Sequence, residues 1–313
     1  MKQFIKSIFL FMAFTTLFYC LFVFAWGTLL PQIFRPNLIY PIGSYGHMFS
    51  RVKEIQDFKN VDILITGSSH AYRGFDTRNF EKEGYSCFNL SSSYQTPIQT
   101  KVLLKRYLDH LNPRTIIFEV YPATFSIDGV ESSLNIIAND RNDLSSIKMA
   151  TDINNIKTYN TLLYGLFRDL FKMNSSFVEP SQKGDDTYIS GGYVEKKPFT
   201  FKHINYKEQY WGFYKKQYDN FEEILSMIKK KNIKLILVNA PLTPALYNSY
   251  ANNDKFDSIM RAYGTYYNFN ELLTLDDSLH FFDADHLNQY GVAVFNKKLI
   301  EILKGELGKN TER

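Results

Sequence analysis

The sequence has few residues that could cross-link the chain or hold a cofactor. It has 313 residues but only two cysteines, Cys20 and Cys87, which excludes a disulfide framework. No CxxC pair and no cluster of histidines and cysteines has the spacing of a structural zinc site. No apolar run is followed by a glycine-rich phosphate-binding loop of the GxGxxG or GxxxxGK[ST] type. We therefore expect neither a metal nor a cofactor.

The chain also has little excess charge. The 36 lysine and arginine residues nearly balance 32 acidic residues, giving a formal net charge of +4, and Lys2 and Lys6 account for two of these positive charges. Nucleic-acid-binding proteins need a concentrated basic face, so nucleic acid is not expected as a partner. The hydrophobic content of 45% and the charged content of 22% exclude a disordered chain.

Charged residues are absent between Lys6 and Arg35. Residues 8–30 are apolar and would form about 35 Å of helix, enough to cross a bilayer. A cleavable signal peptide has a shorter apolar core and a small-x-small cleavage site, whereas this segment has neither. Because Lys2 and Lys6 precede the helix, the positive-inside rule places the chain beyond the helix outside the cytoplasm. The sequence predicts a signal-anchor transmembrane helix over 1–32 in the cell membrane, with a periplasmic or extracellular body. A buried core helix is the alternative.

The rest of the chain predicts an α/β domain over 60–313, connected to the anchor by a tether over 33–59. Three short apolar runs have the composition of buried strands: 61–66, 115–120 and 233–240. Helical patterns lie around them at 100–111, 221–231 and 291–307. Strands that alternate with helices form a parallel sheet covered on both faces, which is a three-layer α/β/α fold.

The segment 123–214 interrupts this alternation. It is polar, it is too long for a plain loop, and it has one helical pattern near 156–173. We expect an insertion here. Insertions of this kind lie over the carboxyl ends of the strands, where they can shape a ligand cleft.

Two short motifs carry candidate chemistry. The first predicted strand ends in Gly67-Ser68-Ser69-His70, a turn that would expose a hydroxyl at the carboxyl edge of the sheet. A serine hydroxyl needs a base before it can act as a nucleophile. In the segment Asp283-Ala284-Asp285-His286, Asp283 lies three residues before His286, so the carboxylate could orient the imidazole. His70 is the rival base, but neighbouring residues on a turn usually point apart.

On these motifs the sequence resembles the SGNH/GDSL hydrolase superfamily, over roughly residues 60–125 and 230–307. The resemblance implies that Ser69 is the nucleophile and that Asp283 and His286 complete a catalytic triad. The family's second block resembles the stretch that begins at Asn89. It places Tyr94 where the family has a glycine whose backbone N–H, with that of Ser69, binds the oxyanion. The third block should fall at residues 121–124, where the family's oxyanion-hole asparagine is missing.

The anchor, the GSS block and the missing asparagine resemble membrane-tethered envelope members, such as alginate O-acetylation proteins and the D-alanine transfer protein of teichoic acids. This implies an extracytoplasmic serine esterase or O-acyltransferase that acts on an acylated envelope polysaccharide. A multi-spanning membrane O-acyltransferase is the implied partner. A simple carbohydrate deacetylase is a related alternative. Losing one oxyanion donor can cost about 10²–10³ in rate, so the alternative of another class is a catalytically inactive scaffold that binds glycan or such an acyltransferase. In these scenarios Ser69 is a turn residue and Asp283 caps the last helix.

Overall fold

The computed structural model describes residues 1–197 and 200–307. At its centre is a five-stranded parallel sheet with the strand order β2-β1-β3-β7-β8. The strands are β1 (Ile63–Thr66), β2 (Cys87–Asn89), β3 (Thr115–Glu119), β7 (Lys234–Asn239) and β8 (Tyr266–Asn268). Because β1 has β2 on one side and β3 on the other, the chain reverses its direction of strand addition at β1. In open α/β sheets ligands bind at the carboxyl ends of the strands next to such a reversal.

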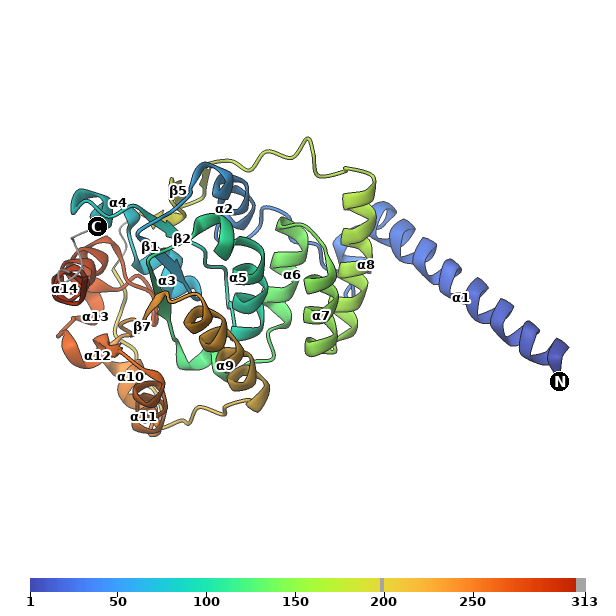
Figure 1. Ribbon diagram of the computed structural model, residues 1–313. Coiled ribbons are helices and arrows are strands. Elements are labelled where there is room, and N and C mark those ends of the chain that lie inside the picture. The colour runs from blue at the N-terminus through green and yellow to red at the C-terminus, as the bar shows by residue number, and fades with distance from the viewer. Residues whose placement is uncertain (198–199, 308–313) are drawn as a thin grey trace.

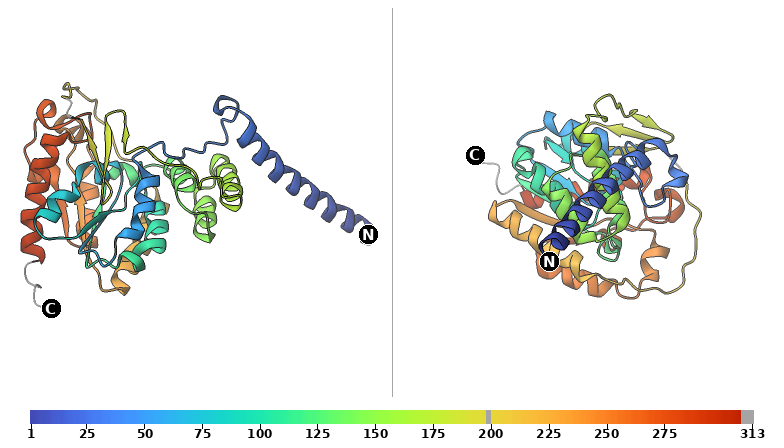
Figure 2. Two further views of the ribbon diagram at one scale, coloured as in Figure 1. Left: turned by 90° about the horizontal axis from the view of Figure 1, so that it is seen from above. Right: turned by 90° about the vertical axis from the view of Figure 1, so that its right-hand side faces the viewer.

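Helices cover both faces of the sheet, so the three-layer α/β fold expected from the sequence is confirmed (Figures 1 and 2). Alternate residues of β1 point into two separate cores: Leu64 packs with α5 and α9 on one face, whereas Ile63 and Ile65 pack with α3 and α14 on the other. This alternation is the period of two that a strand imposes on its side chains.

Three helices of the body, α5, α9 and α14, correspond to the helical patterns at 100–111, 221–231 and 291–307, and most of the other helices were not predicted. The helices of the body are α2 (Met48–Glu54), α3 (Ser69–Gly74), α4 (Thr77–Lys82), α5 (Pro97–Leu111), α9 (Lys215–Lys230), α10 (Pro244–Ser249), α11 (Asn253–Tyr263), α12 (Phe269–Leu272), α13 (Asp277–His280) and α14 (Gln289–Leu307). The last predicted residues of the domain, 308–313, lie outside the described residues.

The segment 33–59, predicted as a tether, packs against the body. It includes the short 3-10 helices η1 (Gln32–Phe34) and η2 (Ile55–Asp57) as well as α2. Leu38, Met48 and Arg51 are fully buried, and the Arg51 guanidinium donates to the backbone carbonyls of Ser91 and Gly192. Burial of this kind fixes the segment in place against the body.

The insertion contains more structure than its polar composition indicated. It begins with η3 (Pro122–Phe125) and continues with α6 (Val130–Asn139), α7 (Leu144–Ile153) and α8 (Ile156–Leu170), the last of which corresponds to the predicted helix. An antiparallel three-stranded sheet comes next in the chain: β4 (Gln182–Lys183), β5 (Asp186–Ile189) and β6 (Tyr193–Lys196). Residues 198–199 of the insertion lie outside the described residues.

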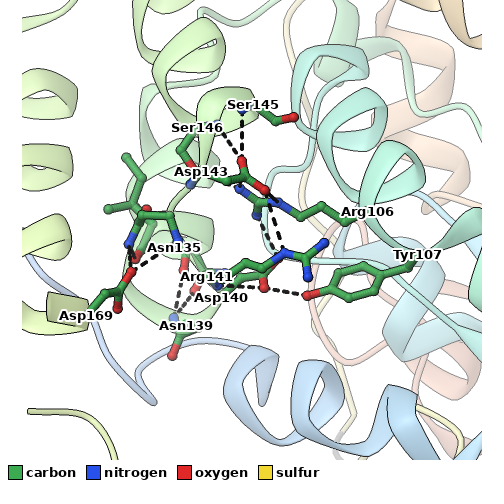
Figure 3. Close-up of polar contacts among 12 residues, drawn as sticks. Arg106, Tyr107, Asn135, Asn139, Asp140, Arg141, Asp143, Ser145, Ser146 and Asp169 are labelled. Carbon is green, nitrogen blue, oxygen red and sulfur yellow. Dashed lines mark hydrogen bonds and ion pairs between the residues drawn. The ribbon is translucent and has the colours of Figure 1, made fainter. Parts of the chain in front are cut away.

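A buried polar network attaches these helices to the body (Figure 3). Arg106 of α5 has its side chain 1% exposed and donates to Asp140, Asp143 and Ser146 at distances of 2.6–3.1 Å. Tyr107 also donates to Asp140. Asp143 in turn caps α7. Because Arg106 and Asp140 are buried and paired, removal of one of them would leave an uncompensated ion. The end of α6 and the start of α7 are therefore held firmly on α5.

The apolar amino-terminal segment forms the helix α1 (Lys2–Leu29), which projects away from the body (Figures 1 and 2). Within the described part of the chain it is the one helix that is long and apolar enough to span a membrane. Every residue from Met1 to Phe18 is exposed. Contact with the body begins at Tyr19, from which point the helix packs on α8.

Candidate active site

The turn between β1 and α3 places Ser69 at the carboxyl edge of the sheet. Ser68 is the N-cap of α3, and its hydroxyl accepts a hydrogen bond from the backbone N–H of His70. Gly67 has φ +152°, and a Cβ at this position would lie 2.6 Å from Oε2 of Glu119. Only glycine allows this close approach of the turn to β3. Ser69 therefore begins a helix directly above a buried strand.

A second turn presents His286 to the same edge. Asp283 Oδ1 accepts hydrogen bonds from the backbone N–H groups of Asp285 and His286, at 3.0 and 2.8 Å. The N-terminus of α14 has a different cap, because Asn288 Oδ1 accepts from the backbone N–H groups of Tyr290 and Gly291. Capping of the last helix, the role considered for Asp283 in an inactive protein, thus belongs to Asn288.

The two turns bring together the three residues that the motifs singled out. Nε2 of His286 lies 2.8 Å from Oγ of Ser69, although 217 positions separate them in the chain. Nδ1 of His286 lies 3.0 Å from both carboxylate oxygens of Asp283. A neutral imidazole that donates from Nδ1 to Asp283 has its Nε2 lone pair available to accept the Ser69 proton. This is the geometry that a serine nucleophile and its base require.

Three buried or half-buried groups extend this arrangement beyond the predicted residues. Oδ1 of Asp285 also lies 3.0 Å from Nδ1 of His286. Oδ2 of Asp285 lies 3.5 Å from Nε2 of His70, and Nδ1 of His70 lies 3.8 Å from Oε1 of Glu119. The side chains therefore alternate in the order Glu119, His70, Asp285, His286, so that each imidazole can carry a positive charge between carboxylates.

The two ring nitrogens of His70 thus face the carboxylates of Glu119 and Asp285. Its ring packs edge-on against Tyr121, with centroids 4.1 Å apart. Glu119 has a second task, because its Oε2 accepts from the backbone N–H and the hydroxyl of Ser68, at 2.7 and 2.8 Å. Through these contacts Glu119 supports both the turn that carries Ser69 and the second histidine.

The charges in this chain of groups change the pKa values of both histidines. Burial alone would lower the pKa of His286, but the carboxylates of Asp285 and Asp283 outweigh burial and raise it. Burial is likewise opposed at His70, where Asp285 and Glu119 raise the pKa to about 10. Burial would raise the pKa of Asp285, yet His286 and His70 lower it below its usual range. At neutral pH we therefore take His70 as a cation and Asp285 as an anion.

Tyr94, expected at the glycine position of the second block, has a left-handed backbone with φ +49°. This is the region that glycine adopts readily and other residues rarely do. Its side chain is 51% exposed, so the tyrosine is accommodated by pointing outward. Asn89, at the start of that block, is buried and donates to the carbonyl of Ala71. At the position of the third block, Tyr121 packs against His70 and Trp211.

A metal ion would compete with this arrangement. Among the described residues, His70, Asp285 and His286 each place a ligand atom within 4.8 Å of the others. A cation bound there would take Asp285 and a ring nitrogen of His286 away from the contacts described above.

Comparison with known proteins gives limited information. No protein-family model matches the chain, and no curated protein matches it significantly. Among solved structures, the chain is similar to a Bacteroides fragilis protein assigned as an acylhydrolase, with 10% identity and a TM-score of 0.44 over 84% of this chain and 98% of that one. It is also similar to a GDSL-like lipase from Bacteroides thetaiotaomicron, with 12% identity and a TM-score of 0.41 over 82% and 98% of the two chains. These values are too low to carry an argument about the site.

Sequence reasoning did not identify Glu119 and Asp285 as parts of the site. A signal for Glu119 was present, because it is the one charged residue in the apolar run 115–120, and acids are almost never fully buried unless they are paired. Asp285 had no comparable signal, since it lies on a polar turn next to a more obvious candidate.

Proposed function

We propose that the protein is a membrane-anchored, extracytoplasmic serine esterase or O-acyltransferase of the SGNH/GDSL type. The observation that carries the proposal is the distance of 2.8 Å between Ser69 Oγ and His286 Nε2, with Nδ1 of the same ring 3.0 Å from Asp283. The order of the three residues along the chain and their places after β1 and before α14 are those of the family that the motifs resemble.

In the proposed reaction Ser69 Oγ attacks the carbonyl carbon of an acyl ester while His286 Nε2 takes the hydroxyl proton. The ester C–O bond then breaks, and His286 returns this proton to the departing alcohol, leaving an acyl group on Ser69. Water or a sugar hydroxyl attacks the acyl-enzyme in the second half, with its proton passing through His286 to Ser69. Hydrolysis and transfer differ only in this acceptor.

Stabilisation of the oxyanion falls to backbone donors in this proposal. Ser69 is the first residue of α3, and the first backbone N–H groups of a helix have no acceptor within the helix. The N–H of Ser69 can therefore donate to the oxyanion. Tyr94 supplies the second backbone N–H from its left-handed position. With no asparagine in the third block, we expect a slower enzyme than one with a complete set of donors, by about 10²–10³.

The proposed substrate is an acyl ester of an envelope polysaccharide, presented outside the cytoplasmic membrane to which α1 anchors the chain. A multi-spanning membrane O-acyltransferase is the proposed source of acyl groups if the reaction is a transfer. The apolar length of α1 and the exposure of its first two thirds support the anchor.

A covalent probe distinguishes the enzyme from an inactive scaffold. We expect a fluorophosphonate ester to modify the full-length protein in detergent or lipid, with the adduct located on Ser69 by peptide mass spectrometry. Ser69→Ala should abolish labelling and Ser68→Ala should retain it. A correctly folded protein that takes no label, or that takes it elsewhere, would assign the chain to the scaffold class.

A further inference from the structure

Several apolar side chains are exposed on the surface around the carboxyl-terminal part of α1. We call six of these residues the collar: Ile33, Phe34, Ile156, Tyr159, Leu170 and Phe171. Their exposed fractions range from 37% at Tyr159 to 81% at Ile33. Residues of this kind are normally scattered over a soluble surface, and a cluster of them marks a site that contacts a protein or a membrane.

The collar is continuous with α1. One face of α8 carries apolar residues at intervals of three or four: Ile156, Tyr159, Leu163, Phe167 and Leu170. Two of them, Leu163 and Phe167, pack on α1. Phe171 lies against Phe24, with ring centroids 5.7 Å apart. From the other side, the Trp26 indole donates to the carbonyl of Phe34.

The contacts between α1 and α8 are close and specific. The hydroxyl of Tyr19 donates to Asn160, and Val23 is fully buried. At Gly27 a Cβ would lie 2.5 Å from ring atoms of Tyr164, so a larger residue would push the helices apart. These contacts, with the Arg106 network behind α7, hold the collar at a fixed level along α1.

That level corresponds to the outer edge of a membrane. A hydrocarbon core of about 30 Å takes about 20 helical residues, so a helix that enters it near Lys6 leaves it near Trp26. The collar meets α1 between Tyr19 and Trp26, which spans about 10 Å of helix. Interfacial helices bury their apolar face to a depth of about 5–10 Å. Lys157 and Lys172 flank the apolar stripe, as expected beside anionic headgroups.

From this geometry we propose that the collar is immersed in the outer membrane–water interface, so that α8 forms a second membrane contact beside α1. The occupant of the surface is lipid. This inference rests on the proposed membrane anchor but not on the esterase activity. Two points of attachment would hold the body in one orientation on the membrane, where a single helix with a free connection would let it swing.

Site-directed fluorescence tests the depth of the collar in the full-length protein. In a Cys20→Ala background the buried Cys87 is the remaining cysteine, and single cysteines are introduced as Ile156→Cys and Phe171→Cys for labelling with an environment-sensitive fluorophore. Leu279→Cys in α13 is the matched control, because Leu279 and Ile156 are both 52% exposed and α13 lies on the far side of the body from α1 (Figure 1). Leu10→Cys reports on α1. The variants are reconstituted in phosphatidylcholine and phosphatidylglycerol bilayers that contain doxyl lipids.

We expect blue-shifted emission and quenching by the doxyl lipids at positions 10, 156 and 171, and neither effect at position 279. Quenching at 10 without quenching at 156 and 171 would overturn the collar and leave the anchor intact. A blue shift at 156 and 171 that grows with protein density and shows no lipid quenching would assign the surface to a second copy of the chain, which also overturns the proposal. Absence of quenching at all positions would reject anchor and collar together, while labelling of Ser69 would test the esterase separately.

Discussion

The carboxyl edge of the sheet and the α1–α8 end of the molecule depart from an ordinary soluble protein in opposite ways. At the sheet edge, Glu119 and His70 are nearly inaccessible ionisable groups, and each compensates the charge of a neighbour in the same chain. At the other end, Leu170 and Phe171 are apolar and exposed, and the described part of the chain leaves them uncovered. Each buried charge faces an opposite charge within the protein, whereas an exposed apolar cluster marks a surface that contacts an outside partner. The charges of the candidate site are therefore paired within the protein, whereas the apolar surface beside α1 is left uncovered by the described residues.

The largest effect that this comparison predicts is at Ser69, where Ser69→Ala removes the proposed nucleophile. We expect ester turnover to fall by about 10⁴-fold or more, with the thermal unfolding temperature unchanged because Ser69 lies at the first position of α3 and caps nothing. Ser68→Ala is the matched control: it removes an N-cap and a hydrogen bond to Glu119, so it should cost about 1 kcal/mol of stability and much less activity. Equal losses of turnover in the two variants would contradict the assignment of the nucleophile.

The carboxylates of Asp283 and Asp285, both beside His286, should contribute unequally to activity. Asp283→Asn removes the group that fixes the ring tautomer, and we expect a loss of about 10⁴-fold at every pH. Asp285→Asn keeps that contact and should cost less. Because the carboxylates raise the pKa of His286, the neutral base exists only above a value higher than the usual 6.5, and activity should rise with pH through that value. Removal of the Asp285 charge should lower the pKa of His286, so the rise of activity with pH should move to lower pH. A rise that stays in place would contradict the effect of Asp285 on the pKa of His286. A larger loss of activity for Asp285→Asn than for Asp283→Asn would reverse the roles of the two acids.

The smallest effect concerns stability and tests whether the buried charges compensate one another. The pKa of His70 is raised to about 10 in the folded protein, so the stability contributed by its protonation is complete below the unfolded value near 6.5 and is lost as pH rises toward 10. We expect the unfolding temperature of the native protein to fall over this interval more steeply than that of His70→Gln. For a domain of this size, each kcal/mol corresponds to about 2–4 °C. Parallel curves for the two proteins would mean that His70 is neutral between its carboxylates.

The sequence allowed the central strands to be predicted but not the edges of the sheet. The runs that became β1, β3 and β7 are buried, apart from the first two residues of β7, and are therefore mainly apolar. Strands β2 and β8 have three residues each, which is too short for any periodic pattern. The hairpin strands β5 and β6 are largely half-buried, and their mixed composition resembles that of a loop.

At the candidate site, contacts within one motif could be predicted from the sequence. Contacts between residues far apart in the chain could not. Asp283 and His286 are three residues apart, so their contact follows from one turn. The approach of Ser69 to His286 depends on the parallel sheet, which brings both turns to one edge. The predicted fold class already implied this parallel sheet. Glu119 and Asp285 meet His70 only because β1, β3 and the last turn converge at one edge. No spacing in the sequence encodes that convergence, and only a packed structure reveals which acids it collects.

If the chain is exported behind α1 as proposed, the separation of Ser69 and His286 by 217 positions has a consequence for biosynthesis. In a chain exported behind an amino-terminal anchor, the nucleophile crosses the membrane early and its base crosses near the end. Throughout translocation the unfolded chain on the cytoplasmic side holds a histidine without its serine. An enzyme assembled in this order would become competent only after its last helix had emerged and folded, so the esters of the cytoplasm would never meet a complete active site.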